Sequence, residues 1–196
     1  MIVMSRRILI LVGHPDPSPD RFGGALASAY ADAAVKAGHT VKRVDLGAMD
    51  VPYLLRQSEF EQGQPPAEIR ALQQNIEWAE HIVLLFPLWL GGVPAKLKAL
   101  LEQVFRGGFG FSIGERGWIS KLKGRSARLV VTMGMPGPVF RLVFGAHGLK
   151  AIEKGILMLA GVRPIRSSII GGVESIGPAG RARWLARMRA LGAKAA

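Results

Sequence analysis

The chain has 196 residues, of which 49% are hydrophobic and none is cysteine, and its formal net charge is +12. This length and composition predict one domain over residues 1–196 with enough apolar side chains for a core. The lack of cysteine excludes disulfides, thiolate chemistry and cysteine-based metal sites. The apolar run Ile8–Val12 is too short for the ~7–15 residues of a secretion signal, and no run approaches the ~20 residues of a membrane span. We therefore expect a soluble, cytoplasmic protein.

The positive charge is compatible with three kinds of partner: nucleic acid, an anionic membrane surface or a phosphorylated cofactor. A basic, solvated surface with no specific partner is the default interpretation. The sequence shows no basic stripe interleaved with aromatic residues, no helix-turn-helix and no zinc-finger pattern. No specific nucleic-acid binding is therefore expected.

The first half of the chain alternates strand-like and helix-like segments. Short apolar or alternating runs predict strands, and apolar side chains at helical spacing predict helices between them. In chain order these are strand Arg7–His14, helix Arg21–Ala37, strand Thr40–Leu46, helix Ala67–Ala79 and strand His81–Phe86. The segment Asp50–Pro66 has no clear period, which predicts a long loop with one short helical turn around Tyr53–Arg56.

The second half continues the same alternation. A helix beginning at Pro94 and a glycine-rich, basic loop at Gly107–Arg125 come first. They are followed by strand Ala127–Thr132, helix Leu149–Leu159, strand Val162–Gly171 and helix Pro178–Leu191. Five strands that alternate with helices favour parallel pairing through right-handed crossovers. The prediction is an α/β fold with one five-stranded parallel sheet and helices on both faces.

The first strand-to-helix junction is His14–Gly24, with the sequence HPDPSPDRFGG. A helix N-terminus offers unpaired N–H groups that suit a phosphate. Ser18 supplies a hydroxyl and Arg21 a fork of N–H donors, and glycines allow close backbone approach. The spacing matches neither G-x-G-x-x-G nor the nucleotide triphosphate loop, and an ordinary proline-rich turn is the alternative interpretation of this junction.

Two further junctions carry apolar or glycine-rich loops. The segment Phe86–Phe105 places Leu88, Trp89 and Leu90 in a turn where a surface loop is usually polar, and Thr132–Pro138 reads TMGMPGP. These loops and the first junction follow strands one, three and four. In the doubly wound order 2-1-3-4-5, strands one and three flank the switch point where flavin mononucleotide (FMN) binds in the flavodoxin-like fold.

His147 stands in FGAHGLK, shortly after the loop of the fourth strand. An imidazole exchanges a proton near neutral pH, so this histidine is a candidate acid or base, with a capping or core histidine as the alternative. The four histidines lack metal-ligand spacing and no Ser-His-Asp arrangement is evident. No metal site is expected.

These motifs resemble the flavodoxin-like NAD(P)H:quinone oxidoreductases, the DT-diaphorase-like family, over Ile8 to about Gly172. That family also includes the oxidoreductase-like ancillary proteins of glutathione-gated potassium efflux. The motif FPLWLGGVPAKLKALLEQVF, followed by GGFGF, resembles the flavin-ring loop and its helix. HPDPSPDRFGGALA is similar to the phosphate-binding turn, and TMGMP with FGAHG is similar to the second ring loop and the catalytic-region histidine.

The resemblance implies roles for residues in three loops and one helix start. The implied phosphate-binding residues are His14, Arg21, Phe22 and Gly23. The implied contacts to the flavin ring are Pro87, Leu88, Trp89 and Leu90 on one side and Thr132, Met133, Gly134 and Met135 on the opposite rim. Phe140 and His147 fall near the paired tyrosine and histidine beside the substrate in the family.

Two departures from the family pattern bear on the chemistry. Arg21 and Gly23 take the places of the serine and asparagine that many members have around Phe22; Arg21 can still bind a phosphate through a charge-assisted fork. Phe140 replaces the tyrosine, so that hydroxyl donor is absent. Proton transfer would then fall to His147 or to a water.

The resemblance implies a flavin enzyme that moves two electrons from NADPH or NADH to quinones or similar electrophiles. FMN is the expected cofactor, with FAD as the alternative, and a homodimer is implied. A second hypothesis is a regulatory subunit of a membrane potassium-efflux transporter, with its basic surface at the membrane periphery. Nucleic-acid association driven by charge is a third, weaker hypothesis, because it does not explain the three loops.

Overall fold

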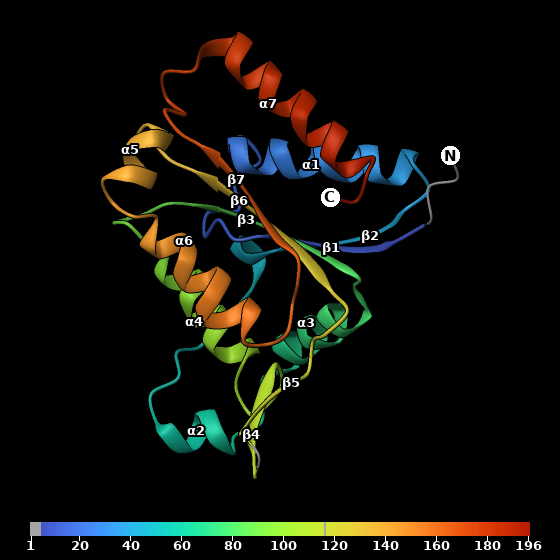
Figure 1. The fold of residues 1–196 in the computed structure, drawn as a ribbon, viewed down its shortest axis with the longest axis vertical. Coiled ribbons are helices and arrows are strands. Elements are labelled where there is room, and N and C mark those ends of the chain that lie inside the picture. Colours follow the sequence, from blue (N-terminus) through green and yellow to red (C-terminus); the bar gives the residue numbers. More distant parts are fainter. Residues whose placement is uncertain (1–4, 116) are drawn as a thin grey trace.

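A computed structural model describes residues 5–115 and 117–196 of the chain. A five-stranded parallel sheet forms its centre (Figure 1), with the order β2-β1-β3-β6-β7. The strands are β1 (Arg7–Val12), β2 (Thr40–Asp45), β3 (His81–Pro87), β6 (Ser126–Thr132) and β7 (Ile165–Ile170). Counted along the chain as the five strands of the sheet, this is the predicted order 2-1-3-4-5, so the predicted fold is confirmed.

Helices cover both faces of the sheet (Figure 1). α1 (Phe22–Lys36) and α7 (Gly177–Gly192) lie on one face. The other face is covered by α3 (Ala67–Trp78), α4 (Ala95–Val104), α6 (His147–Ile152) and the π-helical turn η2 (Glu153–Met158). Side chains of a strand alternate between the two faces, so the core forms two clusters: Leu9 and Leu84 pack in one, and Ile10 and Val83 in the other.

The central strands are mainly apolar because both faces are covered. In β3 the six residues from His81 to Phe86 are all buried, as is typical of a parallel sheet with helices on both sides. Val12 pairs with Leu85 in β3, and Pro87 of β3 pairs with Thr132 of β6. The carboxyl ends of β1, β3 and β6 therefore meet at one edge, and the loops after them meet there too.

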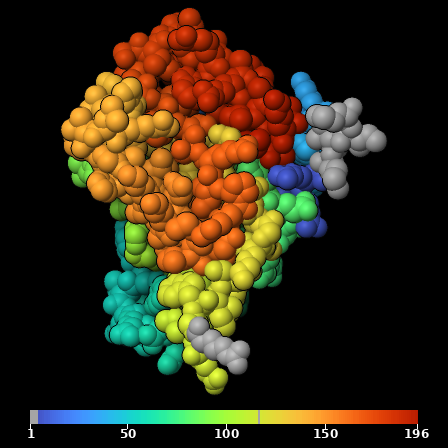
Figure 2. All heavy atoms as spheres, in the orientation of Figure 1, coloured from blue at the N-terminus to red at the C-terminus, as the bar shows by residue number. Residues whose placement is uncertain are grey.

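The prediction of a loop over Gly107–Arg125 was wrong in one respect, because this segment contains an antiparallel hairpin. Its strands are β4 (Phe111–Gly114) and β5 (Gly117–Ser120), and Phe111 stacks on Trp118 with ring centroids 4.6 Å apart. Strands of four residues with a glycine at the turn give a weak alternating signal. The hairpin projects from one end of the molecule, beside the segment that carries α2 (Figure 2).

Three short helical segments also differ from the sequence prediction. The helical turn expected around Tyr53–Arg56 lies instead at α2 (Gln57–Glu61), and the 3₁₀ turn η1 (Leu46–Ala48) and α5 (Gly137–Leu142) were not predicted. Segments this short do not establish a helical period. Within the described residues, no helix combines the length and the apolar character needed to cross a bilayer.

Candidate functional site

Three loops come into contact at the carboxyl edge of the sheet. The His14 ring meets the Trp89 ring edge-on, with centroids 5.9 Å apart and an interplanar angle of 83°. The backbone N–H of Leu88 donates to the Thr132 carbonyl at 2.8 Å. The loop after β1 therefore touches the loop after β3, which in turn touches the end of β6. The sequence placed these three loops at one site, and the structure brings them together.

The loop after β1 leads into an open helix N-terminus. Arg21 is the N-cap residue of α1 and makes no capping side-chain bond, and the first turn contains no acidic residue. A Cβ built at Gly23 or Gly24 would meet no atom within 4 Å. The side-chain positions of both glycines are therefore open, and the uncapped N–H groups of this turn lie at the positive end of the helix dipole, which favours a bound anion.

A cavity of about 210 Å³ lies beside this helix start. Its polar lining comes from the loop, from α1 and from the end of β2: His14, Asp16, Ser18, Arg21, Ser28, Arg43 and Asp45. His14, Ser18 and Arg21 were predicted phosphate-binding residues. Phe22 and Gly23 lie at the start of α1, and the Phe22 ring packs on the second core cluster under the Arg181 guanidinium.

Sequence reasoning missed Arg43 and Asp45 of this cavity. The Arg43 guanidinium donates twice to Asp45, with both bonds 2.8 Å long, and once to Ser28 Oγ at 2.9 Å. The hydrogen bonds to Asp45 raise the pKa of Arg43 above its usual value. In the sequence these residues were only polar positions of an alternating strand. Because β2 lies next to β1 in the sheet, the end of β2 lies beside the loop after β1. This neighbour relation is the signal that could have identified Arg43 and Asp45.

Asp16 organises the first loop. Its carboxylate accepts from the Ser18 N–H at 2.9 Å and from Arg21 Nε at 2.9 Å, and Arg21 Nη2 also bonds it. The Ser18 N–H and the Arg21 guanidinium hold the pKa of Asp16 below its usual range. The ionised carboxylate keeps the Arg21 fork beside the cavity while its remaining N–H groups stay available.

The loop after β3 is a tight two-residue turn. Trp89 and Gly92 exchange two backbone hydrogen bonds of 2.9 Å, and Leu90 and Gly91 between them have φ angles of +47° and +78°. Positive φ at both central residues is the geometry of a type I′ turn. Leu88 packs against the core, Trp89 is 48% exposed and Leu90 projects fully into solvent. The turn presents one half-exposed aromatic face beside His14.

Helix α6 packs directly on this turn. A Cβ built at Gly148 would lie 2.1 Å from the Gly91 carbonyl oxygen and 2.8 Å from Gly92 Cα, so only glycine fits there. This close contact brings His147, the first residue of α6, to the ring loop. His147 is exposed, and its ring folds back over Gly145.

The residues predicted for the opposite rim lie at the end of β6 and in the loop after it. Thr132 and Met135 are half-buried, Gly134 is exposed, and the buried Met133 donates its N–H to the Ile170 carbonyl at 2.9 Å. The sequence placed Phe140 beside the substrate. In the structure its ring is 1% exposed and belongs to the core, so its burial supports a packing role.

Comparison with known proteins agrees with this geometry. The family description "Flavodoxin-like fold" matches residues 6–191. The chain belongs to the flavodoxin-like fold family. Rat NAD(P)H dehydrogenase [quinone] 1 is 26% identical over 92% of this flavodoxin-like chain and 74% of its own length.

Two further proteins are similar to this flavodoxin-like chain. The FMN-dependent NADH:quinone oxidoreductase of Alcanivorax borkumensis is 31% identical over 66% of this chain and 76% of its own. The solved NAD(P)H:quinone oxidoreductase of Methanothermobacter marburgensis has a TM-score of 0.79 and 25% identity, covering 96% of this chain and 98% of its own.

The site of this flavodoxin-like chain fits a flavin. The uncapped first turn of α1, with its open glycines and the Arg21 fork, suits the flavin phosphate. The half-exposed Trp89 ring and the loop after β6 suit the two sides of a flat ring system. The first turn of α1 follows β1, and the turn that carries Trp89 follows β3. Both therefore lie at the switch point between β1 and β3, where ligands bind in sheets of this topology.

Proposed function

We propose that the protein is an FMN-dependent NAD(P)H:quinone oxidoreductase that transfers two electrons from NADH or NADPH to quinones. The observation that carries the proposal is the contact of three loops at the switch point, with an anion-binding turn on one side and the exposed Trp89 on the other. The names of the relatives, quinone oxidoreductases among them, support the same activity.

In this proposal, the residues of the chain bind the flavin and orient it. Arg21 and the first-turn N–H groups of α1 hold the phosphate, and Trp89 forms a wall that keeps water from one side of the ring. When bound, the flavin accepts a hydride from the nicotinamide and passes it to the quinone. His147 gives the proton that completes the quinol oxygen.

FMN is the proposed flavin rather than FAD. Two observations support it: the dependence on FMN that the Alcanivorax relative's name prints, and the small cavity of about 210 Å³ at the phosphate turn. Titration of the purified protein with each flavin tests the choice. We expect FMN to bind more tightly than FAD; equal or tighter FAD binding contradicts it.

Turnover tests the activity itself. Protein reconstituted with FMN should oxidise NADH or NADPH only when a quinone such as benzoquinone is present, and the kinetics should be ping-pong. Bound FMN with no quinone-dependent oxidation of either dinucleotide contradicts the proposal. The comparisons support this enzyme and give no support to the alternative, a regulatory subunit of a potassium-efflux transporter.

The role of His147 has its own test. Because general acid catalysis contributes ~10²–10⁴-fold, His147→Gln should lower kcat for the quinone by at least ~10-fold and leave FMN affinity unchanged. An unchanged kcat would assign the proton transfer to water.

We also propose a homodimer. Exposed apolar side chains on the hairpin support it: Ile113, Trp118 and Ile119. Clusters of this kind mark interaction surfaces. Sizing by light scattering should give twice the chain mass, and Ile113→Asp with Ile119→Asp should shift it to the single-chain mass; a monomeric wild-type protein contradicts the proposal.

A further inference from the structure

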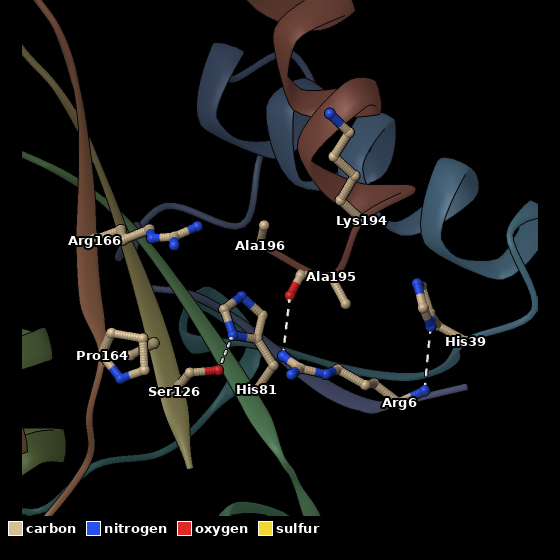
Figure 3. Close-up of a pocket in the computed structure, with 10 residues that line it drawn as sticks. Arg6, His39, His81, Ser126, Pro164, Arg166, Lys194, Ala195 and Ala196 are labelled. Atoms are coloured by element: carbon tan, nitrogen blue, oxygen red, sulfur yellow. Dashed lines mark hydrogen bonds between the residues drawn. The ribbon is translucent and has the colours of Figure 1, made fainter. Parts of the chain in front are cut away.

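A second cavity lies at the amino edge of the sheet, opposite the flavin site. Its volume is about 410 Å³. It is lined by the first residues of two central strands, His81 of β3 and Ser126 of β6, together with Arg6, which precedes β1, and residues 194–196, which follow α7 (Figure 3). The loops of the flavin site follow the other ends of these strands, so the two sites are separated by the length of the sheet. We call this cavity the amino-edge pocket.

The lining of the amino-edge pocket is positively charged. Three cationic side chains and two histidines contribute to it: Arg6, Arg166, Lys194, His39 and His81. None of the ten lining residues is an aspartate or a glutamate. Figure 3 shows Arg166 and Arg6 on opposite sides of the His81 ring. At the flavin site, by contrast, Asp16 and Asp45 balance the two arginines of the cavity.

His81 is buried at the floor of this pocket with one nitrogen unpaired. Its side chain is 2% exposed, and Nδ1 lies 2.8 Å from Ser126 Oγ. Among the described residues, Nε2 has no hydrogen-bond partner. Burial, followed by the charges of Arg6, Arg128, Arg166 and His39, lowers the pKa of His81 to about 4. In the tautomer whose Nδ1 accepts the Ser126 hydroxyl, Nε2 carries an N–H with no acceptor among the described residues.

The cationic side chains around His81 differ in how many hydrogen bonds they already make. Arg128, behind the pocket, donates to the Ala196 main-chain oxygen at 2.6 Å and to Ser168 Oγ at 2.9 Å. Arg6 Nη1 donates weakly to the Ala195 carbonyl at 3.4 Å. Within residues 5–115 and 117–196, neither Arg166 nor Lys194 makes a side-chain hydrogen bond or ion pair. Their donors and the buried Nε2–H are left for a ligand.

We propose that the amino-edge pocket binds a small phosphate-bearing anion through Arg166, Lys194 and the Nε2–H of His81. Cations with no aspartate or glutamate in the pocket lining and, in this tautomer, an unpaired buried N–H match the acceptor oxygens of a phosphate. A free phosphorylated small molecule fits better than a lipid headgroup, because the His81 donor is recessed and the volume suits a compact ligand. This proposal does not depend on the proposed function of the other site.

Calorimetric titration with pyrophosphate tests the proposal. Excess FMN is added first so that the phosphate turn of α1 is occupied. Wild-type protein should bind pyrophosphate with a Kd below ~1 mM. Since charge-assisted bonds are lost at two positions, the exposed pair Arg166→Gln/Lys194→Gln should weaken binding at least ~10-fold. The matched pair Lys154→Gln/Arg183→Gln removes the same two residue types outside the pocket and should stay within about twofold of wild type.

A second readout identifies the buried donor. In NMR spectra, the ring signals of His81 should shift during the pyrophosphate titration of wild-type protein and stay in place in the Arg166→Gln/Lys194→Gln protein. Absence of pyrophosphate binding by the wild type, or equal weakening in both double variants, overturns the proposal. So does wild-type binding to vesicles of anionic phospholipid that needs Arg166 and Lys194 while pyrophosphate does not bind.

Discussion

Arg21 joins the first loop to the open helix start. Its ion pair with Asp16 is largely exposed, with both side chains accessible to solvent. Exposed ion pairs contribute little to stability. The pair therefore serves to position the guanidinium beside the cavity, and replacing Arg21 should leave the fold intact.

Arg21→Gln should weaken FMN binding by ~10–100-fold, because a hydrogen bond to a charged group contributes about 1.5–3 kcal/mol. Riboflavin has the same ring system without the phosphate, so its affinity should change little. Titrations followed by flavin fluorescence measure both. Arg183→Gln, on the exposed side of α7, is the control and should match wild type. An equal loss for FMN and riboflavin would show that Arg21 does not act on the phosphate.

At the scale of elements, α6 is positioned by its contact with the ring loop. The Gly148 backbone touches the Gly91 carbonyl, so the helix start and the turn share one packing constraint. This contact sets where His147 lies relative to Trp89. A change in it should therefore affect both the stability of the protein and the flavin site.

Gly148→Ala should lower the free energy of unfolding by about 1–3 kcal/mol, as overpacking typically does, and should also weaken FMN binding. Gly155→Ala is the matched control, because a Cβ there meets no atom within 4 Å. It should be neutral or slightly stabilising, since alanine reduces the freedom of the unfolded chain. Urea unfolding and FMN titration of both variants provide the comparison. Gly148→Ala behaving like Gly155→Ala would contradict the packing argument.

The elements that the sequence predicted well are those with a strong pattern. Largely apolar runs such as that in β3 admit few alternatives, and five apolar or alternating runs between helices lead to the observed sheet. The β4–β5 hairpin escaped because its strands are short and begin or end at glycines. Arg43 and Asp45 were missed although the predicted order 2-1-3-4-5 places strand two beside strand one. They belong to an alternating strand, and the site residues were sought in the loops after strands one, three and four.

At the scale of the whole molecule, the two edges of the sheet differ in charge. At the carboxyl edge, Asp16 and Asp45 pair with arginines. At the amino edge, His81 lies among cations, and no aspartate or glutamate lines the pocket. Acidic side chains therefore pair with only some of the basic residues that give the chain its net charge of +12. We expect the stability of the protein to depend on pH because of His81 at the amino edge.

His81 should make the protein less stable in acid. Its pKa is about 4 in the folded protein against a usual 6.5, so the unfolded chain takes up a proton between these pH values and the folded protein does not. The free energy of unfolding should fall as the pH drops from about 6.5 to about 4, by at most roughly 3 kcal/mol. Urea unfolding at a series of pH values measures this slope. His81→Gln should flatten it in this window, whatever its effect at neutral pH; an unchanged slope would contradict the assignment.

The most direct test of the account is an anaerobic half-reaction. Protein loaded with FMN and freed of excess flavin is mixed with NADH or NADPH, and the visible flavin absorbance is followed before and after a quinone is added. We expect the reduced dinucleotide to bleach the bound flavin and the quinone to restore its colour. A protein that binds no flavin, or whose bound FMN keeps its absorbance with both dinucleotides, would contradict the account.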